Sequence, residues 1–147
     1  MRSFLSCLLG TWSNKFQAQS HPHLFRQVFL RWEKEGDYLI STHWNRKDPD
    51  SPYLSTQKKL VVLSDDRVLL EHHGGSSTNW IRNSDCDMLL VYNGTSWWGE
   101  FTCNFNTGTQ VYAEMYLFGD KLFTIDKATQ DDKIVWGGDE RYKFIRV

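Results

Sequence analysis

Residues 88–126, MLLVYNGTSWWGEFTCNFNTGTQVYAEMYLFGDKLFTID, decide the fold class. Apolar and polar residues alternate along this stretch in short runs, and a period of two is typical of β-strands. Asn93-Gly94 and Gly119-Asp120 interrupt the runs. We predict a type I′ turn at the first pair and a type II′ turn at the second. The stretch therefore indicates antiparallel strands joined by tight hairpins.

The same pattern continues over most of the chain after residue 20, where helical periodicity is nearly absent. We predict strands at 24–32, 38–45, 53–63, 68–72, 88–92, 97–105, 111–118, 122–126, 133–136 and 142–147. About ten short strands with tight connections form an antiparallel meander that either closes into a barrel or folds into a sandwich. Closure removes the exposed edges, and a barrel of about eight or more strands can hold one small ligand.

The strand at 111–117 shows what periodicity leaves open. One of its faces is aliphatic and the other is aromatic and acidic. A barrel core would take the aliphatic face, whereas a ligand cavity would take the other, and the alternation alone does not say which face points inward. The aliphatic set is Val111, Ala113, Met115 and Leu117; the other set is Tyr112, Glu114 and Tyr116.

Length and composition narrow the function classes. The 147 residues predict a single domain, 1–147. The net charge of −1 argues against a nucleic-acid partner, which needs a basic excess. The mean hydropathy of −0.53, with no long apolar run, predicts a soluble chain that spans no membrane. Aromatic residues make up 15% of the chain, more than a core needs.

The cysteines indicate a reducing compartment, and the histidines indicate that the chain has no metal site. Three cysteines, an odd number without C-x-x-C spacing, predict no disulfide framework, so we place the chain in the cytoplasm. The five histidines lack the spacing of a zinc motif, and we predict no metal site.

The N-terminal region predicts how one end of the barrel closes. The first nine residues are expected to form a short helix across that end. Gly10-Thr11-Trp12 follows, and in lipocalin-like barrels such a tryptophan packs across the closed end. Arg146 or Arg141 would supply a cation–π partner for Trp12. Hydrolase, phosphate-loop and metalloprotease motifs are missing from the sequence, so the residues by themselves predict a ligand-binding barrel without naming its ligand.

An ordered set of landmarks resembles the T-type phycobiliprotein lyases of cyanobacteria. The segment 10–18, GTWSNKFQA, is similar to that family's N-terminal signature. The later landmarks span nearly the whole chain in the family's order: Pro52-Tyr53, Cys86-Asp87-Met88, the hairpin 93–99, Glu114, Asp126, Trp136-Gly137 and Tyr142-Lys143-Phe144.

This resemblance implies an all-β, antiparallel, lipocalin-like (calycin) barrel of about ten strands. It also implies an enzyme, a chaperone-type lyase that binds a linear tetrapyrrole (a bilin, phycoerythrobilin or phycocyanobilin) as its substrate. The bilin would be delivered to a cysteine of a phycobiliprotein β subunit, of phycoerythrin or phycocyanin, where a thioether forms. The compartment would be the cytoplasm of a cyanobacterium or of an infected host. Members of the family are often homodimers, but no residue pattern in this sequence marks a dimer face.

The chemistry of a bilin selects candidate site residues. A carboxylate is needed for the pyrrole N–H groups, and the first choice is Asp126, with Glu114 second. Aromatic walls are needed for stacking, and cations for the propionates. The aromatic candidates are Tyr53, Trp136, Trp98 and Tyr112, and the cationic candidates are Arg82 and Lys58, with Lys59 beside it.

Departures from the family pattern motivate two alternatives. Arginines that tend to follow the Pro-Tyr pair are replaced by Leu54 and Thr56, and the segment after Asp126 has lost arginines too. One alternative is therefore a bilin carrier without transfer activity. Another is a barrel for an unrelated apolar ligand.

Overall fold

Short alternating segments form nearly all of the secondary structure. The computed structural model describes residues 3–76, 79–105 and 107–147. In these residues the strands are β1 (Gly10–Ser13), β2 (Val28–Glu35), β3 (Tyr38–Asn45), β4 (Leu54–Ser64), β5 (Arg67–Ser76), β6 (Asn79–Arg82), β7 (Met88–Tyr92), β8 (Trp97–Asn104), β9 (Thr109–Phe118), β10 (Lys121–Gln130), β11 (Lys133–Gly137) and β12 (Tyr142–Arg146). The helices are α1 (Phe4–Leu8), α2 (Lys15–Ser20) and the 3₁₀ turn η1 (Ser84–Cys86).

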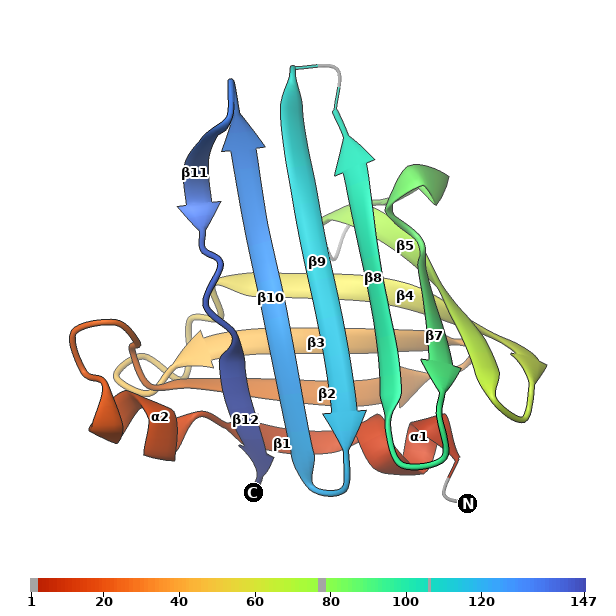
Figure 1. The fold of residues 1–147 in the computed structure, drawn as a ribbon, viewed down its shortest axis with the longest axis horizontal. Coiled ribbons are helices and arrows are strands. Elements are labelled where there is room, and N and C mark those ends of the chain that lie inside the picture. The colour runs from red at the N-terminus through yellow and green to blue at the C-terminus, as the bar shows by residue number, and fades with distance from the viewer. Residues whose placement is uncertain (1–2, 77–78, 106) are drawn as a thin grey trace.

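Ten of these strands close into one antiparallel ring. Their order is β12-β1-β2-β3-β4-β5-β7-β8-β9-β10, and β10 returns to β12 to complete the circle. The remaining two strands attach to the ring, β6 to β5 and β11 to β10. The predicted all-β antiparallel barrel is confirmed, with short helices beside it (Figure 1).

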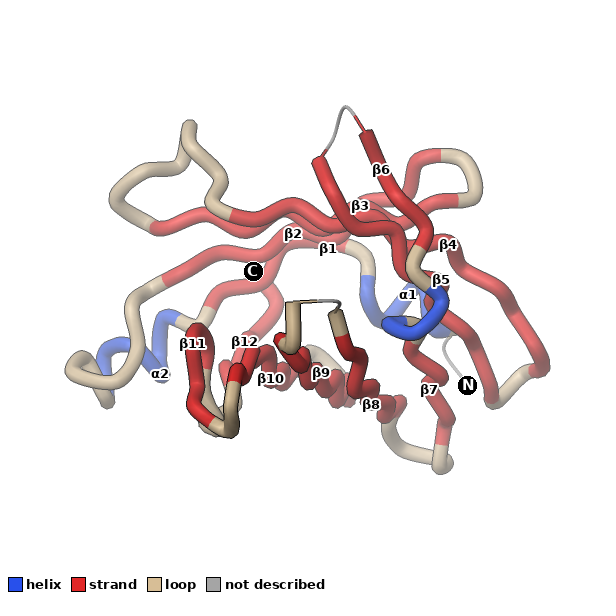
Figure 2. Tube along the Cα trace, turned by 90° about the horizontal axis from the view of Figure 1, so that it is seen from above, coloured by secondary structure: helices blue, strands red, loops and turns tan. Residues whose placement is uncertain are grey.

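The barrel has two differently oriented walls. In Figure 1, β2, β3 and β4 run across the view behind the steep strands β8, β9 and β10. Figure 2, seen from above, shows these two groups on opposite sides, with β12 and β1 joining them at one end and β5 and β7 at the other.

A hydrophobic core fills the end of the barrel next to α1. Trp12, Leu30, Leu90, Leu117 and Leu122 are almost fully buried there. The predicted helix does cover this end: Phe4 of α1 packs edge-on against the Trp97 ring at 5.4 Å. Residues 1–2 of the predicted helix lie outside the described residues.

Of the two arginines predicted to contact Trp12, Arg146 is the one that does so at this end of the barrel. Its guanidinium lies 4.3 Å from the centre of the Trp12 ring, so the predicted cation–π pair is confirmed. The same group donates to the carbonyl oxygens of Leu9 and Cys7. Gly10 has a positive φ of 130°, and a Cβ there would come within 2.7 Å of the guanidinium. The glycine of the Gly-x-Trp motif therefore makes room for the arginine.

Three short elements, two in the N-terminal region and one in the middle of the chain, were not predicted from the sequence. β1 and β6 have only four residues each, too few to show alternation, and α2 has six. α2 lies against β12, because the Gln17 side chain donates to the Arg141 carbonyl at 2.7 Å and accepts from the Lys143 N–H at 2.9 Å.

The structure corrects one hairpin and confirms the other. At Asn93-Gly94 only the glycine has a positive φ, so the predicted type I′ turn is wrong. Four residues separate β7 from β8 there, and the Asn93 side chain accepts from the Thr95 and Ser96 N–H groups. Gly119 alone has a positive φ in its two-residue loop, as a type II′ turn requires. Asp131 and Asp132 both have positive φ, so they form the two-residue turn between β10 and β11.

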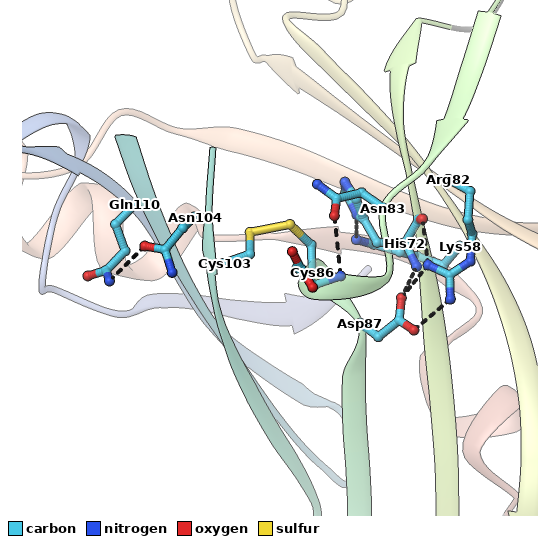
Figure 3. The surroundings of a disulfide bond; sticks show 10 residues. Lys58, His72, Arg82, Asn83, Cys86, Asp87, Cys103, Asn104 and Gln110 are labelled. Carbon is cyan, nitrogen blue, oxygen red and sulfur yellow. Dashed lines mark hydrogen bonds and ion pairs between the residues drawn. A yellow bond between two sulfur atoms is a disulfide. The ribbon is translucent and has the colours of Figure 1, made fainter. Parts of the chain in front are cut away.

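A disulfide corrects the prediction from cysteine counting. Cys86 of η1 is bonded to Cys103 of β8, with Cα atoms 5.1 Å apart (Figure 3). Cys7 is the third, free and buried cysteine, which made the total odd and hid the pair. β7 pairs with β5 only at residues 67–70 of β5, and η1 lies beyond these paired residues. The disulfide therefore joins η1 to β8 in the part of the barrel where β7 no longer pairs with β5.

Candidate functional site

Strand register places a set of polar side chains inside the barrel. β9 turns its aliphatic face inward, since Ala113, Met115 and Leu117 are buried and pair with inward residues of β8 and β10. The same register makes Asp126 of β10 inward-facing, because it lies opposite Ala113. On the facing wall, Lys58 of β4 is opposite Leu39, another core residue.

Asp126 faces open space within the barrel. Asp126 is an exposed residue by accessible surface, and the barrel wall around it still removes part of the water from its carboxyl group. The enclosure decides its chemistry: burial raises the pKa of Asp126 to about 7, and the Lys58 ammonium opposes that rise. The carboxyl is thus poised to exchange a proton near neutral pH, which is typical of functional sites.

Lys58 is the cation that faces this carboxyl. Burial lowers the pKa of Lys58 to about 8, and the carboxylates of Asp126 and Asp87 oppose the shift. The Lys58 ammonium contacts Nδ1 of His72 and lies 5.7 Å from the centre of the Phe101 ring. Burial first, and the Lys58 charge second, lower the pKa of His72 to about 4. His72 is therefore neutral at pH 7 and can accept a hydrogen bond from the lysine.

Two charged residues on the outer side of the barrel, Asp87 and Arg82, fix the backbone of His72. Its backbone N–H donates to the Asp87 carboxylate at 2.8 Å, and Arg82 donates to both oxygens of that carboxylate at 2.6 Å (Figure 3). Burial raises the pKa of Asp87, but the hydrogen bonds from Arg82 and from His72 outweigh it and hold that pKa below its usual range. Asp87 directly follows the disulfide cysteine Cys86, so the disulfide and this ion pair brace the wall that carries His72.

A second group of side chains lies near the start of β4. The Tyr53 N–H donates to the His43 carbonyl at 2.9 Å, and the two rings lie 5.9 Å apart. Arg26 lies 6.0 Å from the centre of the Tyr53 ring. Burial lowers the pKa of His43 to about 4. Burial first, and the nearby Tyr142 second, raise the pKa of Tyr53, and Asp126 contributes to the same shift. This group therefore borders the Asp126 side of the interior.

Four of the residues selected from the sequence belong to this region. Asp126 and Lys58 face the interior, and Tyr53 is half exposed beside it. Trp136 of β11 lies opposite the buried Ala128, and so on its inward face, with half of its surface exposed. We call Asp126, Lys58, Tyr53 and Trp136, with His43, His72, Phe101 and Tyr142, the interior site.

The other four selected residues lie on the outer face and are not brought together with Asp126. Trp98, Tyr112 and Glu114 alternate with the inward residues of β8 and β9. Tyr112 donates to Glu100 at 2.7 Å and to Glu114 at 2.9 Å; burial and these two hydrogen bonds raise the pKa of Tyr112. Arg82 is engaged with Asp87 and Glu71. Lys59 also points outward, opposite Glu71.

Sequence reasoning missed His43, His72, Phe101 and Tyr142. Both histidines lie in predicted strands, but the sequence was searched only for a zinc motif among them. The structure places them at positions that pair with inward residues of the neighbouring strands. Alternation puts His43 on the same face as Leu39, and His72 on the same face as Val68 and Leu70, but only the register with the neighbouring strands shows that these faces point inward.

Several surface hollows accompany the interior site. One of about 410 Å³ is lined by residues from both faces of β4 and β5, among them the inward Thr56 and His72, together with residues of β6 and nearby loops. A larger one, of about 800 Å³, lies outside between α2 and the outer faces of β10 and β12, away from Asp126. In the described ranges no three His, Cys, Asp or Glu side chains are grouped to hold a metal ion. No helix in that part of the chain is long and apolar enough to cross a membrane.

Comparisons with known proteins give matches only at the level of structure. No family model matches the sequence, and a comparison with curated proteins gives no match. The structure of a T-type phycobiliprotein lyase, CpeT from Prochlorococcus phage P-HM1, is similar with a TM-score of 0.76 at 18% identity, over 98% of this chain and 95% of that chain. The CRL protein of Arabidopsis is similar with a TM-score of 0.74 at 12% identity, over 97% of this chain and 94% of that chain. The chain therefore has the barrel fold that a T-type phycobiliprotein lyase and the CRL protein share.

Proposed function

We propose that this chain binds a linear tetrapyrrole in the interior site and transfers it to a cysteine of a phycobiliprotein β subunit. The observation that carries the proposal is the inward-facing pair of Asp126 and Lys58 in a barrel with the fold of a phycobiliprotein lyase. The bilin is phycoerythrobilin or phycocyanobilin, and it is a substrate rather than a resident cofactor.

The charges of the pair match those of the ligand. A carboxylate at Asp126 accepts pyrrole N–H groups and favours the protonated, more electrophilic bilin. Leu54 and Thr56, which stand where the family tends to have arginines, occupy inward positions opposite His43 and Ser41. Lys58 is the next inward residue of the same strand, so its ammonium takes the place of those cations and holds a propionate.

Aromatic side chains supply the walls. Tyr53 and Trp136, both about half exposed, offer flat surfaces for stacking on a conjugated ligand. Each Å² of apolar surface that the bilin buries contributes about 25 cal/mol before the cost of association. Several hundred Å² therefore suffice for reversible binding without a covalent link to the barrel.

The transfer itself needs no oxidant. The acceptor thiol adds to a carbon–carbon double bond at ring A: a carbon–sulfur bond forms, and a proton ends on the neighbouring carbon. By fixing the bilin, the barrel lowers the entropic cost of the correct attack and excludes other thiols.

Co-expression with a bilin-producing pathway tests the proposal, with and without a phycobiliprotein β subunit. We expect a coloured barrel in the absence of the subunit, and a covalent, acid-stable adduct on the subunit in its presence. Colour on the barrel without an adduct identifies a carrier. A colourless barrel contradicts bilin binding and favours an unrelated apolar ligand.

The Asp126→Asn variant tests the site within the same experiment. We expect a shifted visible spectrum, because the amide cannot supply a carboxylate to the pyrrole nitrogens. Glu100→Gln, an exposed acid on the outer face of β8, is the matched control and should leave the spectrum unchanged. An unchanged spectrum and affinity in Asp126→Asn would remove this residue from the site.

A further inference from the structure

β11 is an unusually accessible strand beside the interior site. In the described residues, β10 is its one strand neighbour, so its other edge presents unpaired backbone groups (Figure 1). All five residues are exposed, including three consecutive apolar ones: Ile134 at 48%, Val135 at 54% and Trp136 at 50%. An exposed apolar edge is a template for pairing with another chain.

Two ion pairs hold the segment in place. Lys127 of β10 pairs with Asp139, and Arg141 bonds to the Glu114 carboxylate at 2.6 and 2.8 Å. Glu114 is buried on the outer face, where it anchors the connection from β11 to β12. The edge is thus presented by a fixed strand rather than by a loose tail.

β11 is also continuous with the interior site. Trp136 lies opposite Ala128, and Gly137, with φ at 72°, lies so close to β10 that a Cβ would come within 2.0 Å of the Asp126 carbonyl oxygen. A strand added to the free edge would lie about 4.8 Å beyond β11. Its inward side chains would continue the wall formed by Trp136.

The acidic residues around β11 indicate which kind of segment would pair with its free edge. Residues 131–140 contain four acids, Asp131, Asp132, Asp139 and Glu140, against one basic residue, Lys133, and the ion pair with Lys127 of β10 offsets the charge of Asp139. The acids lie at both ends of β11. A second copy of this chain paired along the edge would bring acids against acids in either direction, which is unfavourable. An extended segment with alternating apolar residues and basic residues at its ends is complementary.

We propose that the free edge of β11 binds an extended, basic-flanked segment of the acceptor protein by strand addition, and that this segment carries the cysteine that receives the chromophore. This inference rests on the proposed function. It is the docking mode in which backbone hydrogen bonds supply affinity and alternate side chains supply specificity. It gives Glu114 and Arg141 the role of positioning residues for β11.

A charge placed on the edge tests the docking. Val135→Lys should raise the acceptor concentration needed for half-maximal transfer about tenfold, while the bilin spectrum of the isolated barrel is unchanged. Val91→Lys is the matched control, because Val91 is an exposed valine on β7, which is paired on both sides. Equal acceptor dependence in Val135→Lys and wild type would overturn the proposal.

The acids are tested separately. Asp131→Asn with Asp132→Asn keeps residues that tolerate positive φ and removes both charges. We expect the half-maximal acceptor concentration to rise severalfold at low salt and to lose most of its salt dependence. A double variant with unchanged affinity and salt dependence contradicts the charge argument.

Amide hydrogen exchange measures docking of the acceptor separately from binding and transfer of the bilin. Among residues 133–137, the amides on the edge that is not paired with β10 should become protected when the apo β subunit is added to the bilin-free barrel, and this added protection should be lost in Val135→Lys. Protection elsewhere but not here overturns the proposal, as does protection at 133–137 in concentrated barrel alone, which assigns the edge to a second copy. Because this measurement needs no bilin, it is decisive even if the barrel proves colourless.

Discussion

At the scale of single residues, the interior site rests on the mutual influence of Asp126 and Lys58. Each is enclosed by the barrel, and each favours the charged form of the other. Their pKa values of about 7 and about 8 leave the carboxyl partly protonated and the amine mostly charged at neutral pH. A site in this state can accept a proton from a ligand or donate one to it.

Removing the lysine should raise the pKa of Asp126. In Lys58→Met the carboxyl keeps its enclosure and loses the cation that lowers its pKa. The ¹³C chemical shift of the Asp126 carboxyl, followed against pH, measures the change. Lys59→Met is the control, because Lys59 points to the outer face. A lower midpoint in Lys58→Met, or equal midpoints in both variants, would contradict the coupling.

The raised pKa of Asp126 also predicts how stability depends on pH. Between its usual value of 3.8 and about 7, the folded chain binds this proton more tightly than the unfolded chain does. The free energy of unfolding therefore falls as pH rises through this range, and the Asp126→Asn variant lacks that contribution. Urea unfolding at about pH 4.5 and about pH 7.5 should show the variant gaining stability relative to wild type at the higher pH. Parallel pH profiles would show that Asp126 titrates normally.

At the scale of elements, the disulfide replaces a missing strand pairing. Beyond Leu70, β5 and β8 have no β7 between them, and η1 joins β8 through Cys86–Cys103. The other side of η1 meets β5 through the Asp87 carboxylate. A covalent link on one side and a hydrogen bond from the His72 N–H on the other thus hold η1 in the barrel wall.

Breaking the disulfide should cost stability. Cross-linking residues 17 apart in sequence is worth about 3 kcal/mol. The double variant Cys86→Ser, Cys103→Ser should lose about that much in urea unfolding, and so should wild type in the presence of a thiol reductant. The reductant should have no further effect on the double variant. If it destabilises both proteins equally, it acts elsewhere.

At the scale of the whole molecule, closure of the barrel depends on residues from the two ends of the chain. Arg146 covers Trp12, bonds to carbonyls at the end of α1, and pairs with Asp120 at 3.2 Å. The bonds to the Leu9 and Cys7 carbonyls are charge-assisted and part-buried, so they are stronger than hydrogen bonds between neutral groups on an open surface.

Loss of this arginine should therefore destabilise the whole barrel. Arg146→Met should lower the free energy of unfolding by about 2–4 kcal/mol, from the cation–π pair and the lost hydrogen bonds. Arg31→Met is the control, since Arg31 lies 5.3 Å from the centre of the Trp44 ring on the outer face and closes nothing. Chemical denaturation of both variants measures the difference, and equal losses would contradict the closing role.

The fold was largely predictable because its signals are local. Alternation and turn residues predicted most strands one by one, and Gly10-Thr11-Trp12 indicated the closed end of the barrel. The type I′ assignment at Asn93-Gly94 failed because the asparagine side chain caps a longer loop. β1 and α2 were not predicted, because such short segments are defined by their packing rather than by a sequence pattern of their own.

The candidate site was predictable only in part. Asp126, Lys58, Tyr53 and Trp136 were selected from the sequence and lie in or beside the interior. Glu114, Tyr112, Trp98 and Arg82 were selected by the same reasoning and lie outside. Nothing local distinguishes the two groups, because each strand offers two equivalent faces until its register with its neighbours is fixed.

The amino-acid sequence by itself therefore determined an antiparallel β-structure, where its tight turns fall and a tryptophan at the closed end, because these follow from local patterns or from one motif. The tertiary structure decided which face of each strand is inside, that Asp126 and Lys58 both face the interior, that Arg146 rather than Arg141 covers Trp12, and that Cys86 is bonded to Cys103. The physical reason is that closing a ring of strands fixes the register of all of them together, and the register alone turns an alternating pattern into an inside and an outside.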